Sequence, residues 1–415
     1  MDLFAIIALL ITLTAVLGWI NERYLRLPTA IGVTIGGLIT SLALIAGTEL
    51  GLGGEHWATT VLTRINFDQL LMHGMLSFLL FAGALHINLN DLWEHRRPIL
   101  TLATLGVLIS TAIVGLSVFL LLGALGLHLP LVHALLFGAL ISPTDPVAVL
   151  AILKRARTPP SLEVQISGES LFNDGIGVVV FTAILDLALG GHGVTAGTVV
   201  LHFLREAGGG VLFGLVLGFI AYRMLYAVDN YSVEVLVTLA LVTGGYWLAQ
   251  EIGLSGPLAM VMAGLFIGNR GRRLAMSDTT RSHLDSFWIV VDESLNAVLF
   301  LLIGLEVLLI DLTPRFLAAG MLAVPVVLIA RFLSVGAPIR LMRLRAAAVP
   351  YALRLMTWSA LRGGIAIALA LSLPASDQRG LILVMTYVVV VFSLLVQGPS
   401  VGPLARRATE AARAG

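Results

Sequence analysis

Four charged side chains lie inside long apolar stretches of this sequence: Asp145, Glu169, Asp174 and Arg331. Ionised groups are rare in such surroundings because the loss of their water costs free energy. A carboxylate that stays there needs a counter-charge, a bound cation or a proton. We therefore take these four residues and their polar neighbours as the candidates for chemistry.

Asp145 lies between two prolines, in the segment Ser-Pro-Thr-Asp-Pro that begins at Ser142. Each proline removes a backbone donor and disfavours helical geometry in the residue before it. We therefore predict a broken helix here, with unpaired carbonyls on one half and unpaired amides on the other. Carbonyl and carboxylate oxygens are suitable ligands for a small hard cation. The alternative is a simple proline kink that Asp145 caps.

A second polar segment runs from Glu169 to Asp174 and includes Ser170 and Asn173. On a helix, Ser170 and Asp174 share one face because they are four residues apart, and Glu169 and Asn173 share an adjacent face. Hydrogen bonding between helices is enough to explain Ser170 and Asn173. It does not explain Asp174, which either a cation or a proton would neutralise. One carboxylate with two competing ligands is the minimal requirement for exchange of a cation for a proton.

Two arginines also fall inside apolar stretches. The guanidinium of Arg331 stays charged and needs a carboxylate, and we predict Glu169 as its partner because Asp145 and Asp174 are assigned to the cation. Arg362 is a possible accessory residue. It precedes Gly363 and Gly364, which could interrupt a helix as the prolines near Asp145 do.

The composition identifies the elements that must position these residues. Of 415 residues, 58% are hydrophobic and 12% are charged, whereas soluble domains carry about 25% charged residues. The sequence also lacks the alternation of apolar and polar residues that is typical of β-barrel strands. Together with the apolar composition, this indicates an all-α polytopic membrane protein. The absence of cysteine excludes disulfides, thiolate catalysis and cysteine-bound metals. The net charge of +1 makes nucleic acid an implausible partner, and we expect neither a cofactor nor enzymatic activity.

Apolar runs predict about thirteen transmembrane helices in one domain over residues 1–415. The first run is read as a span and not as a signal peptide because it lacks a basic start. Asp292 and Glu293 are expected near a solvated span end. The predicted spans are 3–21, 28–47, 67–88, 98–123, 131–153, 163–190, 197–226, 232–251, 255–269, 284–309, 314–339, 350–374 and 380–403.

Basic residues predict the orientation of these spans, because cytoplasmic loops are enriched in Lys and Arg. Of 25 such residues, 19 fall in loops on one side and 4 on the other, while Arg331 and Arg362 lie inside spans. This places the N-terminus outside and the C-terminus in the cytoplasm. Spans one to six and eight to thirteen would form two inverted six-helix repeats, in which the broken fifth and twelfth spans correspond.

The motifs together resemble the bacterial NhaP-type Na⁺/H⁺ antiporters of the monovalent cation/proton antiporter-1 family. The motifs are Thr144-Asp145-Pro146, Gly168-Glu169-Ser170 with Asn173-Asp174, Arg331-Phe332 and Arg362-Gly363-Gly364, and they keep the family's order along essentially the whole chain.

This resemblance implies a homodimer in the bacterial inner membrane that works by an elevator mechanism. A moving core, over approximately 98–190 and 314–403, would carry the site, and the remaining helices would form the dimer. Na⁺ or Li⁺ would compete with H⁺ for Asp174, while Asp145, the Thr144 carbonyl and Ser170 would help to bind the cation. Glu169 and Arg331 would form a structural ion pair. The Asn173-Asp174 pair resembles that of electroneutral members.

One position departs from the family pattern, and other functions stay open. Many relatives carry an acidic residue in the third span where this chain has Ala82. A water could replace that ligand, or the cation preference could differ, so K⁺/H⁺ or poorly selective exchange is the first alternative. An intramembrane aspartyl protease that uses Asp145 and Asp174 is a remote one, because a Gly-x-Gly-Asp motif is absent. A channel fits a paired, single-carboxylate site less well.

Overall fold

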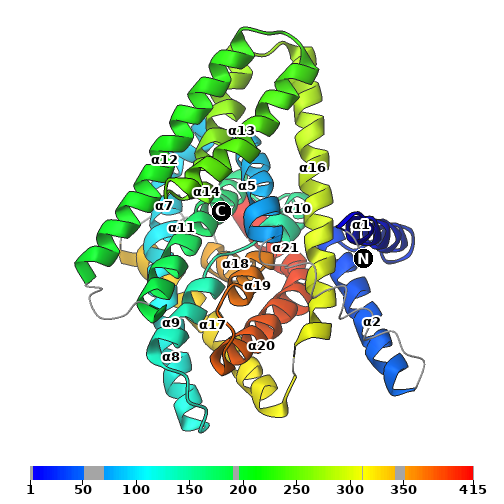
Figure 1. Cartoon of the computed structure of the whole chain (residues 1–415), viewed down its shortest axis with the longest axis vertical. Coiled ribbons are helices and arrows are strands. Elements are labelled where there is room, and N and C mark those ends of the chain that lie inside the picture. The colour runs from blue at the N-terminus through cyan, green and yellow to red at the C-terminus, as the bar shows by residue number, and fades with distance from the viewer. Residues whose placement is uncertain (1–2, 51–69, 190–195, 311, 342–350, 415) are drawn as a thin grey trace.

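The computed structural model describes residues 3–50, 70–189, 196–310, 312–341 and 351–414. This part of the chain is helical and contains no β-strand beyond one isolated bridge (Figure 1). The predicted all-α membrane fold is therefore confirmed.

The helices follow one another in this order: α1 (Leu3–Ile20), η1 (Asn21–Leu25), α2 (Thr29–Glu49), η2 (Leu70–Met75), α5 (Leu76–Leu85), α6 (Leu89–Glu94), α7 (Arg96–Thr101), η3 (Leu102–Gly106), α8 (Val107–Ala124), α9 (Leu131–Ile141), α10 (Val147–Ala156), α11 (Pro160–Leu189), α12 (Ala196–Tyr226), α13 (Tyr231–Glu251), α14 (Gly256–Phe266), η4 (Ile267–Gly271), α15 (Arg272–Leu274), α16 (Asp278–Leu305), η5 (Glu306–Leu309), α17 (Pro314–Leu341), α18 (Ala352–Trp358), α19 (Gly364–Leu371), α20 (Asp377–Phe392), η7 (Ser393–Gln397) and α21 (Gly398–Ala414).

Nine helical stretches in the described ranges are long and apolar enough to cross a membrane. The predicted spans 131–153 and 350–374 are each divided into two short helices, α9 with α10 and α18 with α19. Part of the predicted span 67–88 lies outside the described residues. The count of thirteen spans therefore stays a prediction, although helix makes up most of each predicted span within the described residues.

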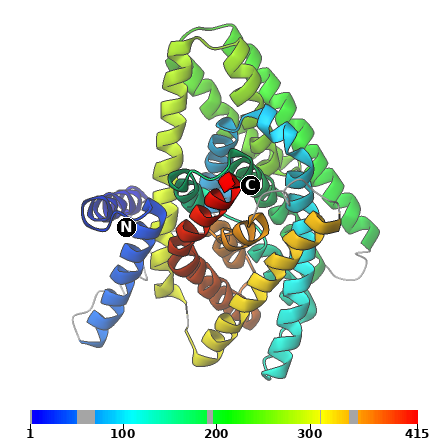
Figure 2. The same cartoon turned by 180° about the vertical axis from the view of Figure 1, so that it is seen from behind.

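One group of helices packs around α9 and α11. Helix α8 lies against α9 and α17, α11 lies against α9, and α20 packs on α17 and α19. These helices occupy the lower half of Figure 1, and Figure 2 shows α17 and α20 crossing on the opposite side. They fall within the predicted core ranges 98–190 and 314–403, while the functional division into core and dimerisation helices stays a prediction.

A second group packs around α14 and α16. Helix α14 contacts α5, α12 and α13, and α16 contacts α2, α5 and α13. The hydroxyl of Thr34 donates to the Phe300 carbonyl at 3.1 Å, and that of Ser41 donates to the Gly304 carbonyl at 3.1 Å. Such bonds attach α2 to α16. In a bilayer, apolar contact alone favours helix association little, because lipid tails are as apolar as the side chains of a helix.

Small residues bring α12 and α14 into close contact. A Cβ atom at Gly210 would lie 2.6 Å from the Ser255 carbonyl oxygen, and one at Gly214 would overlap the backbone of Ala259. Gly218, one turn further along, faces Ala263. The glycines at every fourth position therefore let the two backbones pack directly.

Candidate ion-binding site

The segment between the two prolines interrupts a helix, as predicted. Helix α9 ends at Ile141 and α10 begins at Val147. The Asp145 carboxylate accepts a hydrogen bond from the Val147 amide at 2.9 Å, which gives the start of α10 an acceptor. Asp145 therefore lies at the positive end of a half-helix, where a negative charge is stabilised.

A second interruption crosses the first. Helix α18 ends at Trp358 and α19 begins at Gly364, so the predicted break beside Gly363 is confirmed. The Asp145 amide donates to the Leu361 carbonyl at 2.8 Å, which joins the two breaks by backbone. A Cβ atom on Gly363 would overlap the Asp145 carboxylate, so the crossing requires a glycine at this position.

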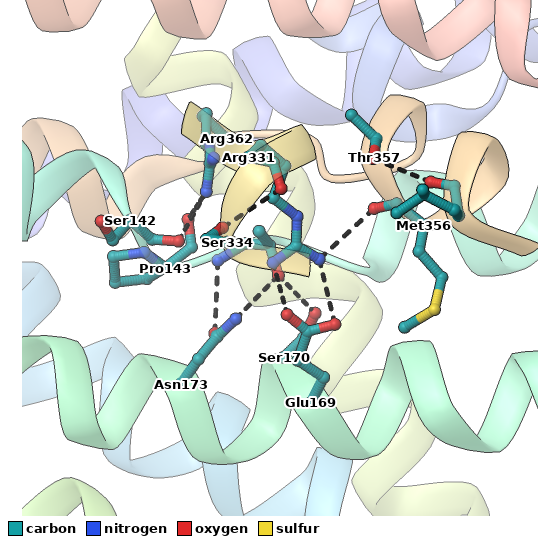
Figure 3. Close-up of polar contacts among 12 residues, drawn as sticks. Ser142, Pro143, Glu169, Ser170, Asn173, Arg331, Ser334, Met356, Thr357 and Arg362 are labelled. Carbon is teal, nitrogen blue, oxygen red and sulfur yellow. Dashed lines mark hydrogen bonds and ion pairs between the residues drawn. The ribbon is translucent and has the colours of Figure 1, made fainter. Parts of the chain in front are cut away.

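Arg362 lies between the two broken helices. Its guanidinium donates to the carbonyls of Ser142 at 2.6 Å and Pro143 at 2.7 Å (Figure 3). The residue is 2% exposed. Because these carbonyls follow α9, Arg362 places its positive charge at the negative end of that half-helix. No contact of Arg362 was predicted from the sequence, because its partners lie about 220 residues away along the chain.

Glu169 on α11 and Arg331 on α17 form a buried bidentate ion pair. The two hydrogen bonds, Nη1 to Oε1 and Nη2 to Oε2, measure 2.5 and 3.0 Å (Figure 3). Arg331 also donates to the Met356 carbonyl in α18 at 3.3 Å. The pair therefore links α11 and α17 to the helix that ends at the second break.

Three polar side chains connect α11 to the first break. The hydroxyls of Thr144 and Ser170 are 2.8 Å apart, and the Asn173 amide donates to the Thr144 hydroxyl at 2.9 Å. The Thr144 amide donates back to the Asn173 side chain at 3.3 Å. All three residues are buried. Asn173 therefore fixes the backbone beside Asp145.

Asp174 and Asp145 face the same cavity, whose volume is about 680 Å³. The lining extends to Lys154 near the end of α10 and to Glu163 near the start of α11. Within the described ranges, the Asp174 carboxylate makes no hydrogen bond or ion pair with a protein group. It is therefore free to take a ligand from the cavity.

Asp292 and Asn296 line the same cavity, a placement that we did not predict. Asp292 lies in the middle of α16. The Asn296 amide donates to the Asp292 carboxylate at 3.1 Å. The spacing of four residues was a signal that these two side chains share a helix face.

Ala82 on α5 also lines the cavity and is fully buried. It contributes no oxygen ligand. Within the described part of the chain, no three His, Cys, Asp or Glu side chains gather as for a bound metal ion. The oxygen atoms around Asp145 and Asp174 instead suit a hard cation that binds and leaves.

Comparison with known proteins agrees with this geometry. The model of the transmembrane sodium/hydrogen exchanger family matches residues 6–407. The Na⁺/H⁺ antiporter NhaP of Pseudomonas aeruginosa is 47% identical over 97% of this chain and 96% of its own. The antiporter NhaH of Halobacillus aidingensis is 33% identical over 98% of both chains.

A solved structure has the same fold. The sodium proton antiporter MjNhaP1 of Methanocaldococcus jannaschii, at pH 8, superposes with a TM-score of 0.76 over 99% of this chain and all of the other, at 23% identity. The broken crossing helices, the buried charges and the family match over nearly the whole length lead to one conclusion. The chain belongs to the sodium/hydrogen exchanger family.

Proposed function

We propose that this protein exchanges Na⁺ for H⁺ across a membrane, with Asp174 as the carboxylate that both ligands share. The observation that carries the proposal is the position of Asp174 in the cavity without a protein partner among the described residues. Sodium or a proton each neutralises it, and neither binds while the other is there. Alternating access of one such site to the two sides couples the two flows.

The remaining oxygen ligands of the cation come from the first break and from α11. We assign them to Asp145, the Thr144 carbonyl and Ser170. The two hydrogen bonds between Asn173 and Thr144 support this assignment, since they fix the loop that carries two of the ligands. Preorganised ligands lower the cost of replacing the water around a small cation.

Three further buried charges serve the structure and do not take part in exchange. Glu169 and Arg331 satisfy each other, and Arg362 satisfies the carbonyls that follow α9. Asn173 does not titrate. With Asp145 ionised throughout, the loaded site carries the same charge with Na⁺ as with H⁺, so exchange is electroneutral. We propose that Li⁺ shares the site; with Ala82 in place of a carboxylate, a water replaces that ligand or the cation preference differs, and K⁺/H⁺ exchange is the alternative.

The cellular arrangement follows from the charge pattern and the family. We propose a multi-pass protein of the bacterial inner membrane with its N-terminus outside and its C-terminus in the cytoplasm. The excess of basic residues in alternate loops supports this orientation. We further propose a homodimer whose core moves as an elevator. The fold and family are those of a transporter, which supports the absence of enzymatic activity.

The experiment is a proton-flux assay in proteoliposomes with Na⁺, Li⁺ and K⁺ offered in turn. We expect Asp174→Asn to abolish cation-driven proton flux without unfolding the protein, because an amide neither releases a proton nor balances a cation. Asp186→Asn makes the same chemical change on the same helix, outside the cavity, and is expected to keep the flux. Substantial flux through well-folded Asp174→Asn would remove Asp174 from the mechanism.

A further inference from the structure

A second hollow lies away from the ion site, where α2, α10 and α21 meet. Its volume is about 330 Å³. Leu27 lines it from the loop before α2 and Ile31 from the first turn of α2. Ile152 and Arg155 line it from α10, and Gly402 and Arg406 from α21. In the orientation proposed above, on which this inference rests, this end of the molecule lies at the cytoplasmic surface of the membrane. We call this hollow the α2–α10–α21 groove.

The groove combines an apolar floor with a cationic rim. Leucine, isoleucine, proline and glycine make up most of its lining, and Arg155 and Arg406 are its charged residues. Both arginines are exposed and form no ion pair or hydrogen bond within the described ranges. Glu410, one turn beyond Arg406 on α21, does not pair with it. Two cations at the edge of an apolar hollow therefore lack a counter-charge from the protein.

The backbone adds to the positive potential at this rim. The first turn of α2 lines the groove, and its first hydrogen bond runs from the Gly32 amide to the Pro28 carbonyl at 3.0 Å. The amides of Ala30 and Ile31 precede that bond and lie at the positive end of the helix. The Asn21 side chain donates to the Leu27 carbonyl at 2.9 Å, which fixes the approach to this turn.

We propose that the α2–α10–α21 groove binds one anionic phospholipid from the cytoplasmic leaflet. The phosphate lies between Arg155 and Arg406 at the start of α2, and the upper part of an acyl chain covers the apolar floor. Anionic headgroups are attracted to basic residues at this depth. The apolar floor distinguishes a lipid from free phosphate, which would leave that floor uncovered.

The bound lipid contacts helices that pack mainly on different neighbours. Helix α2 packs on α16, whereas α10 packs on α21. A molecule that contacts α2, α10 and α21 stabilises their present arrangement relative to any arrangement in which they separate. We therefore expect the lipid to raise the melting temperature of the protein.

The test is a titration of the delipidated, full-length protein in detergent with phosphatidylglycerol. Melting temperature and retained lipid, by native mass spectrometry, are the two measurements. Phosphatidylcholine tests the headgroup charge, and inorganic phosphate tests the need for an acyl chain. We expect phosphatidylglycerol alone to raise the melting temperature and to be retained, at one site per chain.

The arginines of the groove are tested against a matched pair. In Arg155→Gln/Arg406→Gln, the apparent affinity for phosphatidylglycerol should fall about thirty-fold. Each basic residue near the surface contributes about 1 kcal/mol to lipid binding, and two are removed. Arg157→Gln/Arg407→Gln removes the same charge next to the same positions but outside the groove. That control should bind as the unaltered protein does. Equal weakening in the two double variants would show a diffuse surface effect and would overturn the proposal.

A third variant fills the groove without changing its charge. A Cβ atom at Gly402 meets Ile152 at 3.6 Å, an ordinary contact, so Gly402→Leu extends into the hollow. We expect this variant to lose the retained phosphatidylglycerol and its thermal shift. Retention by Gly402→Leu, or an equal shift with inorganic phosphate or phosphatidylcholine, would overturn the lipid assignment.

Discussion

The pairing of Glu169 with Arg331 leads to a quantitative prediction about stability. The two side chains are 1% and 8% exposed and are joined by hydrogen bonds of 2.5 and 3.0 Å. Replacing either residue with methionine leaves the other charge buried without a counter-charge. That loss costs about 3–5 kcal/mol of unfolding free energy. The loss for Arg331→Met should lie at the upper end of this range, because this variant also removes the hydrogen bond to the Met356 carbonyl. That bond contributes about 1 kcal/mol.

The double variant distinguishes a true pair from two independent residues. Methionine at both positions removes both charges and keeps most of the volume, and such replacements are often neutral or stabilising. We therefore expect Glu169→Met/Arg331→Met to be more stable than either single variant. The coupling free energy should be at least about 3 kcal/mol.

The assay is chemical unfolding in detergent micelles, followed by tryptophan fluorescence. An exposed pair gives the matched control. Arg281 and Asp278 lie 3.3 Å apart with side chains 38% and 99% exposed, and their alanine cycle should show no measurable coupling. Losses for Glu169 and Arg331 that add to within about 0.5 kcal/mol would refute the pairing as a source of stability.

Three further predictions concern exchange and the crossing of the broken helices. A membrane potential imposed on proteoliposomes should drive no steady Na⁺ uptake, whereas a pH gradient should; uptake driven by potential alone would require a second titrating group. At pH values where protons saturate Asp174, one further pH unit of acidification should raise the apparent KM for Na⁺ about tenfold, and an unchanged KM would argue against competition for one carboxylate. Gly363→Ala should lose about 1–3 kcal/mol of stability and most of the flux, because its Cβ atom overlaps the Asp145 carboxylate. Gly123→Ala is the control, because a Cβ atom at Gly123 meets open space. It should lower neither the stability nor the flux.

Local chemistry explains what the sequence predicted well. Two prolines in five residues disfavour a continuous helix, and so the break at Asp145 could be predicted without a structure. The pairing of Glu169 with Arg331 was inferred by elimination, because very few charges lie inside the apolar stretches. The structure joins these two residues.

Contacts between distant segments explain what the sequence did not show. Nothing near Arg362 indicates that its guanidinium meets the carbonyls of Ser142 and Pro143, because the crossing of the two breaks creates that contact. Asp292 was expected near a solvated span end, and the sequence did not show that it lines the cavity. That placement depends on how α16 packs against α2 and α5.

The separation of 162 residues between Glu169 and Arg331 has a consequence for biosynthesis. Synthesis proceeds at about 5–20 residues per second, so Glu169 emerges about 8–30 seconds before its partner. During that interval an ionised Glu169 in the bilayer would cost at least about 2.5 kcal/mol. The nascent α11 avoids this cost if Glu169 stays protonated, or if the helix stays beside the insertion machinery, until α17 is made. The last third of the chain thus completes the burial of a charge made in its first half.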